Sequence, residues 1–257
     1  MPSNPNGRVV PLKEKISSHQ KAWELDIADG RRIIEALRSG FPLTDRQFDK
    51  LFSPNARRCS KRHWTPVETA KRAASLLTEG LECKILDVGS GVGKFCIVGA
   101  LSTPATYFGV EQRKWLVSES NYITQSLPIP RVHFLSTQMN EIDWGEFDHF
   151  YFYNPFYEQI VESARIDENV EFATEHYDAY VTWVKMQLAK ARTGTKVVTF
   201  HGMGGEMPPS YELICRETNA DGYLELWEKK EKSVVKGFDF PVIRTGRETD
   251  FDLPCTD

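Results

Sequence analysis

Three glycines alternate with other residues between two apolar runs of the chain, in the segment Asp87-Val88-Gly89-Ser90-Gly91-Val92-Gly93. The first run has the length and composition of a buried strand, and the second continues as a helix. Glycine permits a tight turn and lets the backbone approach a ligand closely. The loop is therefore a candidate binding site, although glycine-rich turns between strand and helix also occur where nothing binds.

Two phosphate-binding patterns do not fit this loop. A P-loop requires G-x-x-x-x-G-K-[ST], but Val88 stands at its first glycine position and Phe95 replaces its hydroxyl residue. A dinucleotide-binding turn requires G-x-G-x-x-G, which would need a glycine at Lys94. What remains is an acidic residue at a strand end followed by G-x-G-x-G.

A second acidic residue, Glu111, ends the strand-like segment 106–111. It lies about 20 residues beyond the glycines, the separation at which a carboxylate meets ribose hydroxyls in nucleotide-binding sheets. A solvated glutamate at a strand end is the alternative reading. Because the loop and the carboxylate occur in register, the sequence favours a ligand that carries a ribose.

A polar and aromatic segment follows the strand-like residues 149–153, and it reads Asn154-Pro155-Phe156-Tyr157. The carboxyl end of a strand borders the ligand crevice in an open α/β sheet. Asn154 would place a polar side chain at that crevice, and Phe156 and Tyr157 would add aromatic walls. The alternative is a strand that ends at a proline turn, with its aromatic rings in the core.

Strand-like and helix-like segments alternate from residue 83 to residue 200. Strands are expected at 83–88, 106–111, 132–135, 149–153 and 195–200. Repeated βα order predicts a parallel sheet with helices on both faces. Two further strand-like runs, 211–217 and 223–228, flank a turn signal and predict a hairpin. The sequence thus predicts an α/β fold with a doubly wound seven-stranded sheet, mostly parallel, with a C-terminal antiparallel hairpin.

An arm and a helical extension are expected ahead of this alternation, over residues 1–64. Helical spacing of apolar residues predicts two helices between 12 and 37, separated by Gly30. Thr44 is expected to cap a short helix ending near Phe52. Thr65, Pro66 and Glu68 then predict a capping box at the start of the α/β domain, 65–235. Residues 236–257 are expected to form a C-terminal tail.

Composition narrows the classes of partner. The formal net charge of −4 argues against wrapping of nucleic acid by bulk electrostatics. A basic cluster at 57–62 is read as a solvated turn or as a contact for an acidic partner or nucleic acid. Five cysteines without C-x-x-C and six histidines without metal spacing predict no metal site and a reducing compartment. Without a signal segment or an apolar run of bilayer length, we expect a soluble cytoplasmic protein that does not contact membranes.

The loop, Glu111 and the terminal hairpin together resemble class I S-adenosylmethionine-dependent methyltransferases, which have a Rossmann-like fold. The resemblance implies S-adenosyl-L-methionine as cofactor, with Glu111 on its ribose. The resemblance also implies that the amino-acid end of the cofactor is bound by Asp87, Gly89, Ser90, Gly91 and Gly93. Asn154-Pro155-Phe156-Tyr157 resembles the motif [DNS]-P-P-[FYW] of amino-group methyltransferases, with one proline instead of two. In that motif the polar side chain and a backbone carbonyl accept hydrogen bonds from the nucleophilic nitrogen.

A narrower similarity is to the non-SET histone-lysine methyltransferases, carried by the loop and by the segment Tyr107-Phe108-Gly109-Val110-Glu111. It implies that Thr65 touches the cofactor and that Asn154 lies beside it. After the third strand the chain departs from that family, which has an acidic residue followed by an aromatic one. Gln138 and the backbone near Met139 are expected to contact adenine instead.

Three functions follow as hypotheses. The first is N-methylation of a protein amine such as lysine, with a protein as the acceptor partner. The second is nucleic-acid methylation of the adenine-N6 type, which the 154–157 segment and the basic cluster favour. The third is a non-catalytic protein that binds S-adenosylmethionine. The sequence determines neither the acceptor nor the oligomeric state.

Overall fold

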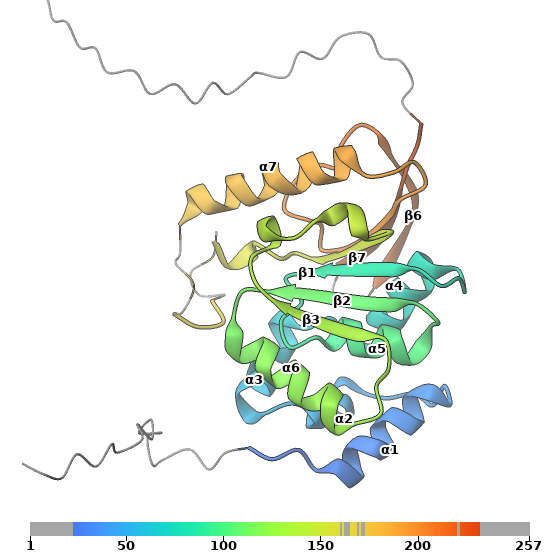
Figure 1. Ribbon diagram of the computed structural model, residues 1–257, viewed down its shortest axis with the longest axis vertical. Helices are drawn as coiled ribbons and strands as arrows, with labels where there is room; N and C mark the ends of the chain where they lie inside the picture. The colour runs from blue at the N-terminus through green and yellow to red at the C-terminus, as the bar shows by residue number, and fades with distance from the viewer. Residues whose placement is uncertain are drawn as a thin grey trace, which may run out of the picture.

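A seven-stranded sheet forms the centre of the protein (Figure 1). The computed structural model describes residues 23–159, 161, 165–168, 170, 173–219 and 222–231, so the predicted arm before residue 23 and the tail 236–257 lie outside it. The strand order is β3-β2-β1-β4-β5-β7-β6. The strands are β1 Lys84–Val88, β2 Thr106–Glu111, β3 Val132–Ser136, β4 His149–Tyr153, β5 Lys196–Phe200, β6 Tyr211–Asn219 and β7 Gly222–Lys229.

The first five strands pair in parallel, whereas β7 pairs antiparallel with both β5 and β6. This arrangement confirms the predicted doubly wound sheet with its terminal hairpin. The order reverses between β1 and β4, so the connections from their carboxyl ends leave toward opposite faces. In open α/β sheets such a switch point leaves a crevice where ligands bind.

Both faces of the sheet are buried, which explains the nearly continuous apolar composition of its central strands. Successive side chains of β1 and β4 enter different apolar clusters: Ile85 and Tyr151 belong to one, and Leu86 and Phe152 to the other. The first cluster lies under α4 (Val67–Thr78), α5 (Lys94–Ser102) and α6 (Lys114–Ser126). The second lies under α7 (Thr174–Lys190), which Figure 1 shows on the opposite side of the sheet from α5 and α6.

The N-terminal helices pack against the same core as the sheet. They are α1 Ile27–Arg38, α2 Asp45–Phe48, the 3-10 turn η1 Asp49–Leu51 and α3 Pro54–His63. Their apolar residues, among them Ile34, Leu51 and Phe52, belong to the cluster under α5. The division of the chain at residue 64 stays a prediction, but these helices share a core with the α/β domain.

Two predictions about this region were wrong. Gly30 does not separate two helices: it lies inside α1, where a β-carbon would stand 2.9 Å from the side chain of Leu127, so it permits close packing. The basic cluster 57–62 is not a turn but part of helix α3. Thr44, in contrast, caps α2 and forms a capping box with Gln47, and the turn that follows ends at Leu51 as expected.

The predicted capping box at Thr65 is also wrong. Helix α4 begins at Val67 after Pro66, without a capping side chain from its own turn. The Val67 N–H instead donates to Oδ1 of Asp45, 2.9 Å away. The Thr65 hydroxyl lies 2.9 Å from the hydroxyl of Tyr151 on β4. A long-range contact therefore replaces the local cap.

A buried lysine connects these helices to the glycine loop. Lys94, the first residue of α5, has only 2% of its side chain exposed. Its Nζ lies 2.6 Å from Oδ1 of Asp45 and 2.7 Å from Oδ1 of Asp49. The hydroxyl of Ser60 donates to the other oxygen of Asp49 at 2.5 Å. One ammonium group thus holds α2 and η1 against the start of α5.

Candidate active site

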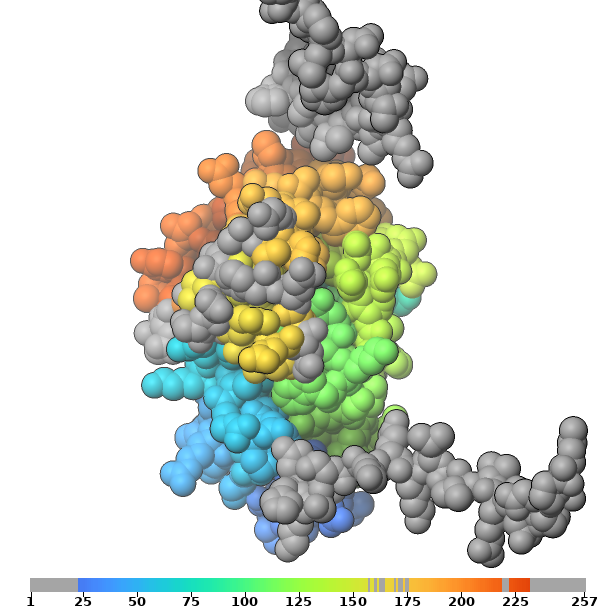
Figure 2. Space-filling model, turned by 90° about the vertical axis from the view of Figure 1, so that its left-hand side faces the viewer, coloured from blue at the N-terminus to red at the C-terminus, as the bar shows by residue number. Residues whose placement is uncertain are grey.

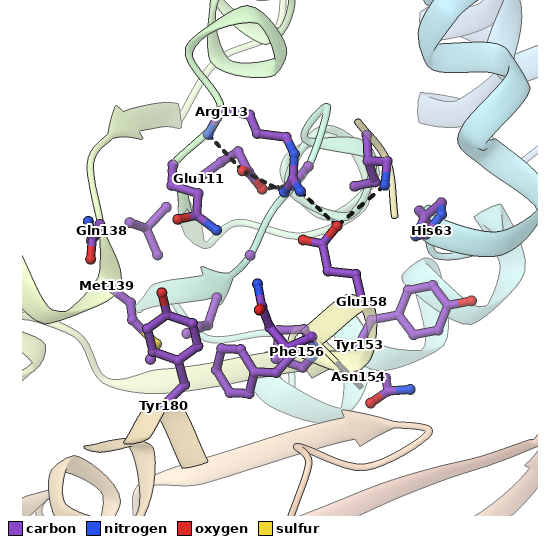
Figure 3. A pocket seen from close by; sticks show the side chains of 18 of the residues that line it. His63, Glu111, Arg113, Gln138, Met139, Tyr153, Asn154, Phe156, Glu158 and Tyr180 are labelled. Atoms are coloured by element: carbon purple, nitrogen blue, oxygen red, sulfur yellow. Dashed lines mark hydrogen bonds and ion pairs between the residues drawn. The ribbon is translucent and has the colours of Figure 1, made fainter. Parts of the chain in front are cut away.

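A cavity of about 390 Å³ opens at the carboxyl ends of β1, β2 and β4, within the usual size range of ligand pockets. Figure 2 looks onto this side of the molecule, where the segment after β4, in yellow, lies between α3 in blue-green and α6 in green. Figure 3 shows many of the lining side chains. Predicted site residues in the lining are Gly89, Gly91, Glu111, Gln138, Met139, Asn154, Pro155 and Phe156.

The backbone of the glycine loop explains its spacing. Gly89, Gly91 and Gly93 have φ values of +75°, +55° and +77°, a left-handed conformation that other residues rarely adopt. At Gly91 a β-carbon would also stand 2.3 Å from the ring of Trp64. The alternating glycines thus form the turn, and the indole of Trp64 packs directly on it.

The amides of this loop are used inside the protein. The N–H groups of Gly89 and Ser90 both donate to the carbonyl of Val110 at 3.0 Å, and that of Gly91 donates to Oε2 of Glu111 at 3.2 Å. These three amides therefore already have partners within the protein, and the contact of the loop with the amino-acid end of a cofactor stays a prediction. Ser90 and Gly93 lie outside the lining, and the buried Ser90 hydroxyl has no hydrogen-bond partner among the described residues.

Glu111 lies at the cavity wall, with only 5% of its surface exposed. Besides Gly91, its carboxylate accepts a hydrogen bond from the backbone N–H of Arg113 at 2.8 Å. Burial raises the pKa of Glu111, against the opposing effect of the Arg113 guanidinium. The carboxylate is thereby fixed in place at the end of β2, where the ribose contact was predicted.

Arg113 is a site residue that the sequence did not indicate. Its side chain is 3% exposed and contacts three carboxylates: Glu111 at 3.6 Å and Glu158 at 2.7 Å (Figure 3), and Asp167 at 3.2 Å. The indole N–H of Trp115 donates to Asp167 as well, at 2.6 Å. Arg113 therefore ties the end of β2 to the segment that follows β4. Only the fold brings these residues together, because Asp167 is 54 positions away in the sequence.

Asp87 lies below the loop and not in the lining. Its carboxylate is 4% exposed and accepts a hydrogen bond from Sγ of Cys96 at 3.5 Å. Burial raises the pKa of Asp87 to about 7; the Cys96 contact lowers it, and the nearby Glu111 raises it. Its contact with the amino group of a cofactor stays a prediction.

The raised pKa of Asp87 predicts how stability changes with pH. Between its ordinary value of 3.8 and about 7, the folded protein binds a proton that the unfolded chain has released. The free energy of unfolding should therefore fall as pH rises across this window, by roughly 3 kcal/mol between pH 5 and pH 8. In Asp87→Asn this contribution should be absent. Urea unfolding of both proteins at the two pH values measures the difference.

The control for this experiment is Asp178→Asn, which removes an exposed carboxylate on α7. It should keep the pH dependence of the wild type. If Asp87→Asn also keeps that dependence, Asp87 does not titrate in this window.

The segment after β4 packs directly on the glycine loop. A β-carbon at Gly89 would stand 3.1 Å from Cβ of Pro155. Asn154 has a left-handed φ of +37°, and its N–H donates to the carbonyl of Gly202 at 3.2 Å. Phe156 is buried beside Tyr180 of α7, with ring centres 5.4 Å apart. Tyr157 begins the 3-10 turn η4 (Tyr157–Gln159), and its predicted role in walling the site stays a prediction.

Aromatic rings surround the end of the cavity next to Asn154. His63 and His201 both line it. Burial lowers the pKa of His63 to about 4, and Arg62 and Arg113 lower it further, so this imidazole is uncharged at neutral pH. Tyr153 lies 5.7 Å from the ring of His201, and its hydroxyl donates to the carbonyl of Arg62 at 3.2 Å.

The other end of the cavity is formed by the residues after β3. Met139 is buried, and the exposed Gln138 caps the 3-10 turn η2 (Met139–Glu141). Both line the cavity where adenine contacts were expected. Thr65 does not line it, because its hydroxyl faces Tyr151.

The described residues contain no group of three His, Cys, Asp or Glu side chains arranged to hold a metal ion. Within the same part of the chain, no helix combines the length and apolar character needed to cross a bilayer.

Comparison with known proteins yields neither a family model nor a curated protein that matches the chain. Among solved structures it is similar to an RNA methyltransferase from Salinibacter ruber in complex with S-adenosyl-L-homocysteine (17% identity, TM-score 0.46), covering 68% of this chain and 99% of that one. It is also similar to TrmN from Thermus thermophilus (14%, TM-score 0.48), covering 68% of this chain but only 52% of that one.

A putative methyltransferase, yhhF from Escherichia coli, is another such structure (9% identity, TM-score 0.44), with 70% of this chain and 89% of that one covered. Likenesses at such low identity and TM-score do not determine an activity, which is therefore argued from the site itself. The narrower resemblance stays a prediction.

Proposed function

We propose that this protein is an S-adenosylmethionine-dependent methyltransferase that acts on a nitrogen atom. One observation carries the proposal: Gly91, Glu111 and Asn154 line the same cavity, and Pro155 packs on Gly89. The glycine loop, Glu111 and the segment after β4, for which the sequence predicts the three roles of cofactor loop, ribose contact and acceptor site, therefore line one cavity.

The lining fits the parts of S-adenosylmethionine in turn. Each carboxylate oxygen of Glu111 accepts one N–H and has a second lone pair, so the side chain can still accept hydrogen bonds from a ribose diol. Gln138 and Met139 flank the space for adenine. Because the N–H groups of Gly89, Ser90 and Gly91 already have partners, we infer that a cation contributes to binding the ligand carboxylate, and Arg62 lines the cavity.

When bound, the cofactor supplies an electrophilic methyl group on a sulfonium. The protein has to align the acceptor with that group and exclude water, which can account for much of the rate enhancement. The Asn154 side-chain oxygen can accept a hydrogen bond from the acceptor N–H and so turn the nitrogen lone pair toward the methyl group. Phe156 and Tyr180 close this part of the cavity with apolar surface.

The charge of the lining bears on the acceptor. The sequence placed a lysine-like amine first, but such an amine is protonated at neutral pH and has to lose its proton before it can attack. Among the described lining residues the acids are Glu111 and Glu158, and both contact Arg113. Of the two histidines in the lining, His63 is made a weaker base by burial, which lowers its pKa to about 4. The site therefore favours a nitrogen that arrives neutral, such as the exocyclic amine of a nucleobase.

Substitution of Asn154 tests the proposal. In Asn154→Ala, turnover should fall about 100-fold, because a positioned hydrogen bond to the reacting group is lost. Cofactor affinity should change by less than about threefold, since Glu111 and the glycine loop are untouched. Transfer of labelled methyl groups into cell extract, with nuclease and protease digests compared, measures turnover, and calorimetry measures affinity.

Two further variants separate chemistry from backbone strain. Asn154→Gly also removes the amide but adopts a positive φ without strain, so it should be as inactive as Asn154→Ala. Asn140→Ala, at an exposed position in η2, should behave as the wild type. Full turnover in either Asn154 variant would show that this residue does not orient the acceptor. A non-catalytic protein would bind the cofactor and transfer nothing in any form.

A further inference from the structure

We propose that the exposed basic face of α3 binds the phosphates of a single-stranded nucleic acid, one base of which enters the cavity as the methyl acceptor. The inference rests on the proposed function and names its substrate class. It starts from the charge distribution. Between Asp49 and Glu68 the chain has no acidic residue and five basic ones, Lys50, Arg57, Arg58, Lys61 and Arg62, although the whole protein has a net charge of −4.

Three of these basic residues share one face of α3. Arg58, Lys61 and Arg62 are three and four residues apart, a spacing that places them side by side on a helix, and all three are exposed. Arg57 is directed elsewhere, with its Nε donating to the carbonyl of Phe52 at 2.7 Å. The opposite face is buried against the core and holds Ala56, Ser60 and Trp64.

Two of the three charges on this face, those of Arg58 and Lys61, have no carboxylate partner among the described residues. Arg58 contacts the neutral side chain of Asn55, at 2.7 Å. Guanidinium and ammonium groups without carboxylate partners suit phosphate oxygens, which arginine can bind in a bidentate manner.

The basic face runs into the acceptor end of the cavity. Arg62 and His63, at the end of α3, line the cavity, and the Arg62 carbonyl accepts the hydrogen bond from Tyr153. Figure 3 shows His63 and Tyr153 on the same side of the pocket. A nucleic-acid backbone bound along α3 would therefore place a nucleotide within about one helical turn of the cavity that Asn154 lines.

The lining at that end suits a planar base. It is formed largely by rings, those of His63, Trp64, Tyr153, Phe156, Tyr180 and His201. Aromatic side chains bind unpaired bases by stacking on their faces. A base inside a duplex could not reach them, so the acceptor has to be single-stranded or turned out of its helix. An acidic peptide would also suit the basic face but would leave the rings without a matching group.

Binding of labelled oligonucleotides tests this inference. Fluorescence anisotropy of the full chain with fluorescein-labelled single-stranded RNA and DNA of one sequence should show binding that weakens with salt. In Arg58→Gln/Lys61→Gln the affinity should fall about tenfold. The negative slope of log K against log salt should become shallower by about 1.4, or 0.7 for each lost phosphate contact. The difference between RNA and DNA identifies the preferred polymer.

The matched control is Arg31→Gln/Arg32→Gln, which removes two exposed charges from α1 and should leave binding unchanged. Equal affinity of the α3 variant and the wild type, or no binding of either polymer at low salt, would overturn the inference. So would methyl transfer that only protease digestion removes. Calorimetry with S-adenosylmethionine is independent of α3: if the wild type does not bind it, the proposed function and the acceptor role fail together, whereas loss of oligonucleotide binding alone overturns only this inference.

Discussion

Replacement of Glu111 by alanine should abolish measurable binding of S-adenosylmethionine. The carboxylate is held at the cavity wall by the N–H groups of Gly91 and Arg113, and we propose that it accepts hydrogen bonds from both ribose hydroxyls. Two hydrogen bonds to a charged acceptor contribute about 3–6 kcal/mol together, which corresponds to at least about a 100-fold loss of affinity. Titration calorimetry of the purified variant with the cofactor measures the loss.

The fold of this variant should survive, because Arg113 keeps Glu158 and Asp167 as partners. Glu111→Gln retains one oxygen acceptor and should bind with intermediate affinity, a graded response that a purely structural role does not predict. Glu146→Ala, at an exposed position in the 3-10 turn η3 (Trp144–Glu146), serves as the control. If Glu111→Ala binds S-adenosylmethionine with wild-type affinity, Glu111 does not contact the ribose.

Replacement of Lys94 by methionine should destabilise the protein by about 3–5 kcal/mol, the usual effect of removing one partner from a buried ion pair. The single ammonium lies between Asp45 and Asp49, and without it two carboxylates would face each other beside an apolar core. Urea unfolding measured by circular dichroism gives the change. Because Lys94 directly follows Gly93, cofactor affinity should fall in the same variant.

Lys71→Met provides the comparison. It breaks an ion pair with the exposed Glu68 at the surface of α4 and should change stability by less than about 1 kcal/mol. An equally small effect of Lys94→Met would mean that the helices before residue 64 contribute little to the stability of the α/β domain. The buried contacts lead us to expect the opposite.

Local patterns were sufficient to predict the sheet. The residues 106–111 and 149–153 are strands with the predicted bounds, because bulky and β-branched side chains are buried there on both faces. The glycine spacing was equally informative, since three left-handed φ values leave few alternatives to glycine. The meeting of Glu111 and Asn154 in one cavity followed from the expected parallel order, which places the carboxyl ends of strands at one edge.

Contacts between distant segments could not be predicted. Thr65 has the sequence context of a helix cap, yet Asp45, 22 positions before Val67, caps α4 and leaves the Thr65 hydroxyl to Tyr151. Arg113 does not belong to a recognisable motif. Its role depends on ion pairs with Glu158 and Asp167, which follow β4 in the sequence and reach Arg113 only in the folded chain. In each case a buried charge or a backbone N–H finds its partner in a distant part of the chain. The spacing of residues within one segment carries no information about such partners.

The most direct test of the central claim is titration calorimetry of the full chain with S-adenosylmethionine. We predict saturable binding of one cofactor molecule per chain, strongly weakened in Glu111→Ala and nearly unchanged in Asn154→Ala. Absence of binding to the wild-type protein at millimolar cofactor would contradict the account, because the cavity at the ends of β1, β2 and β4 would then serve another ligand.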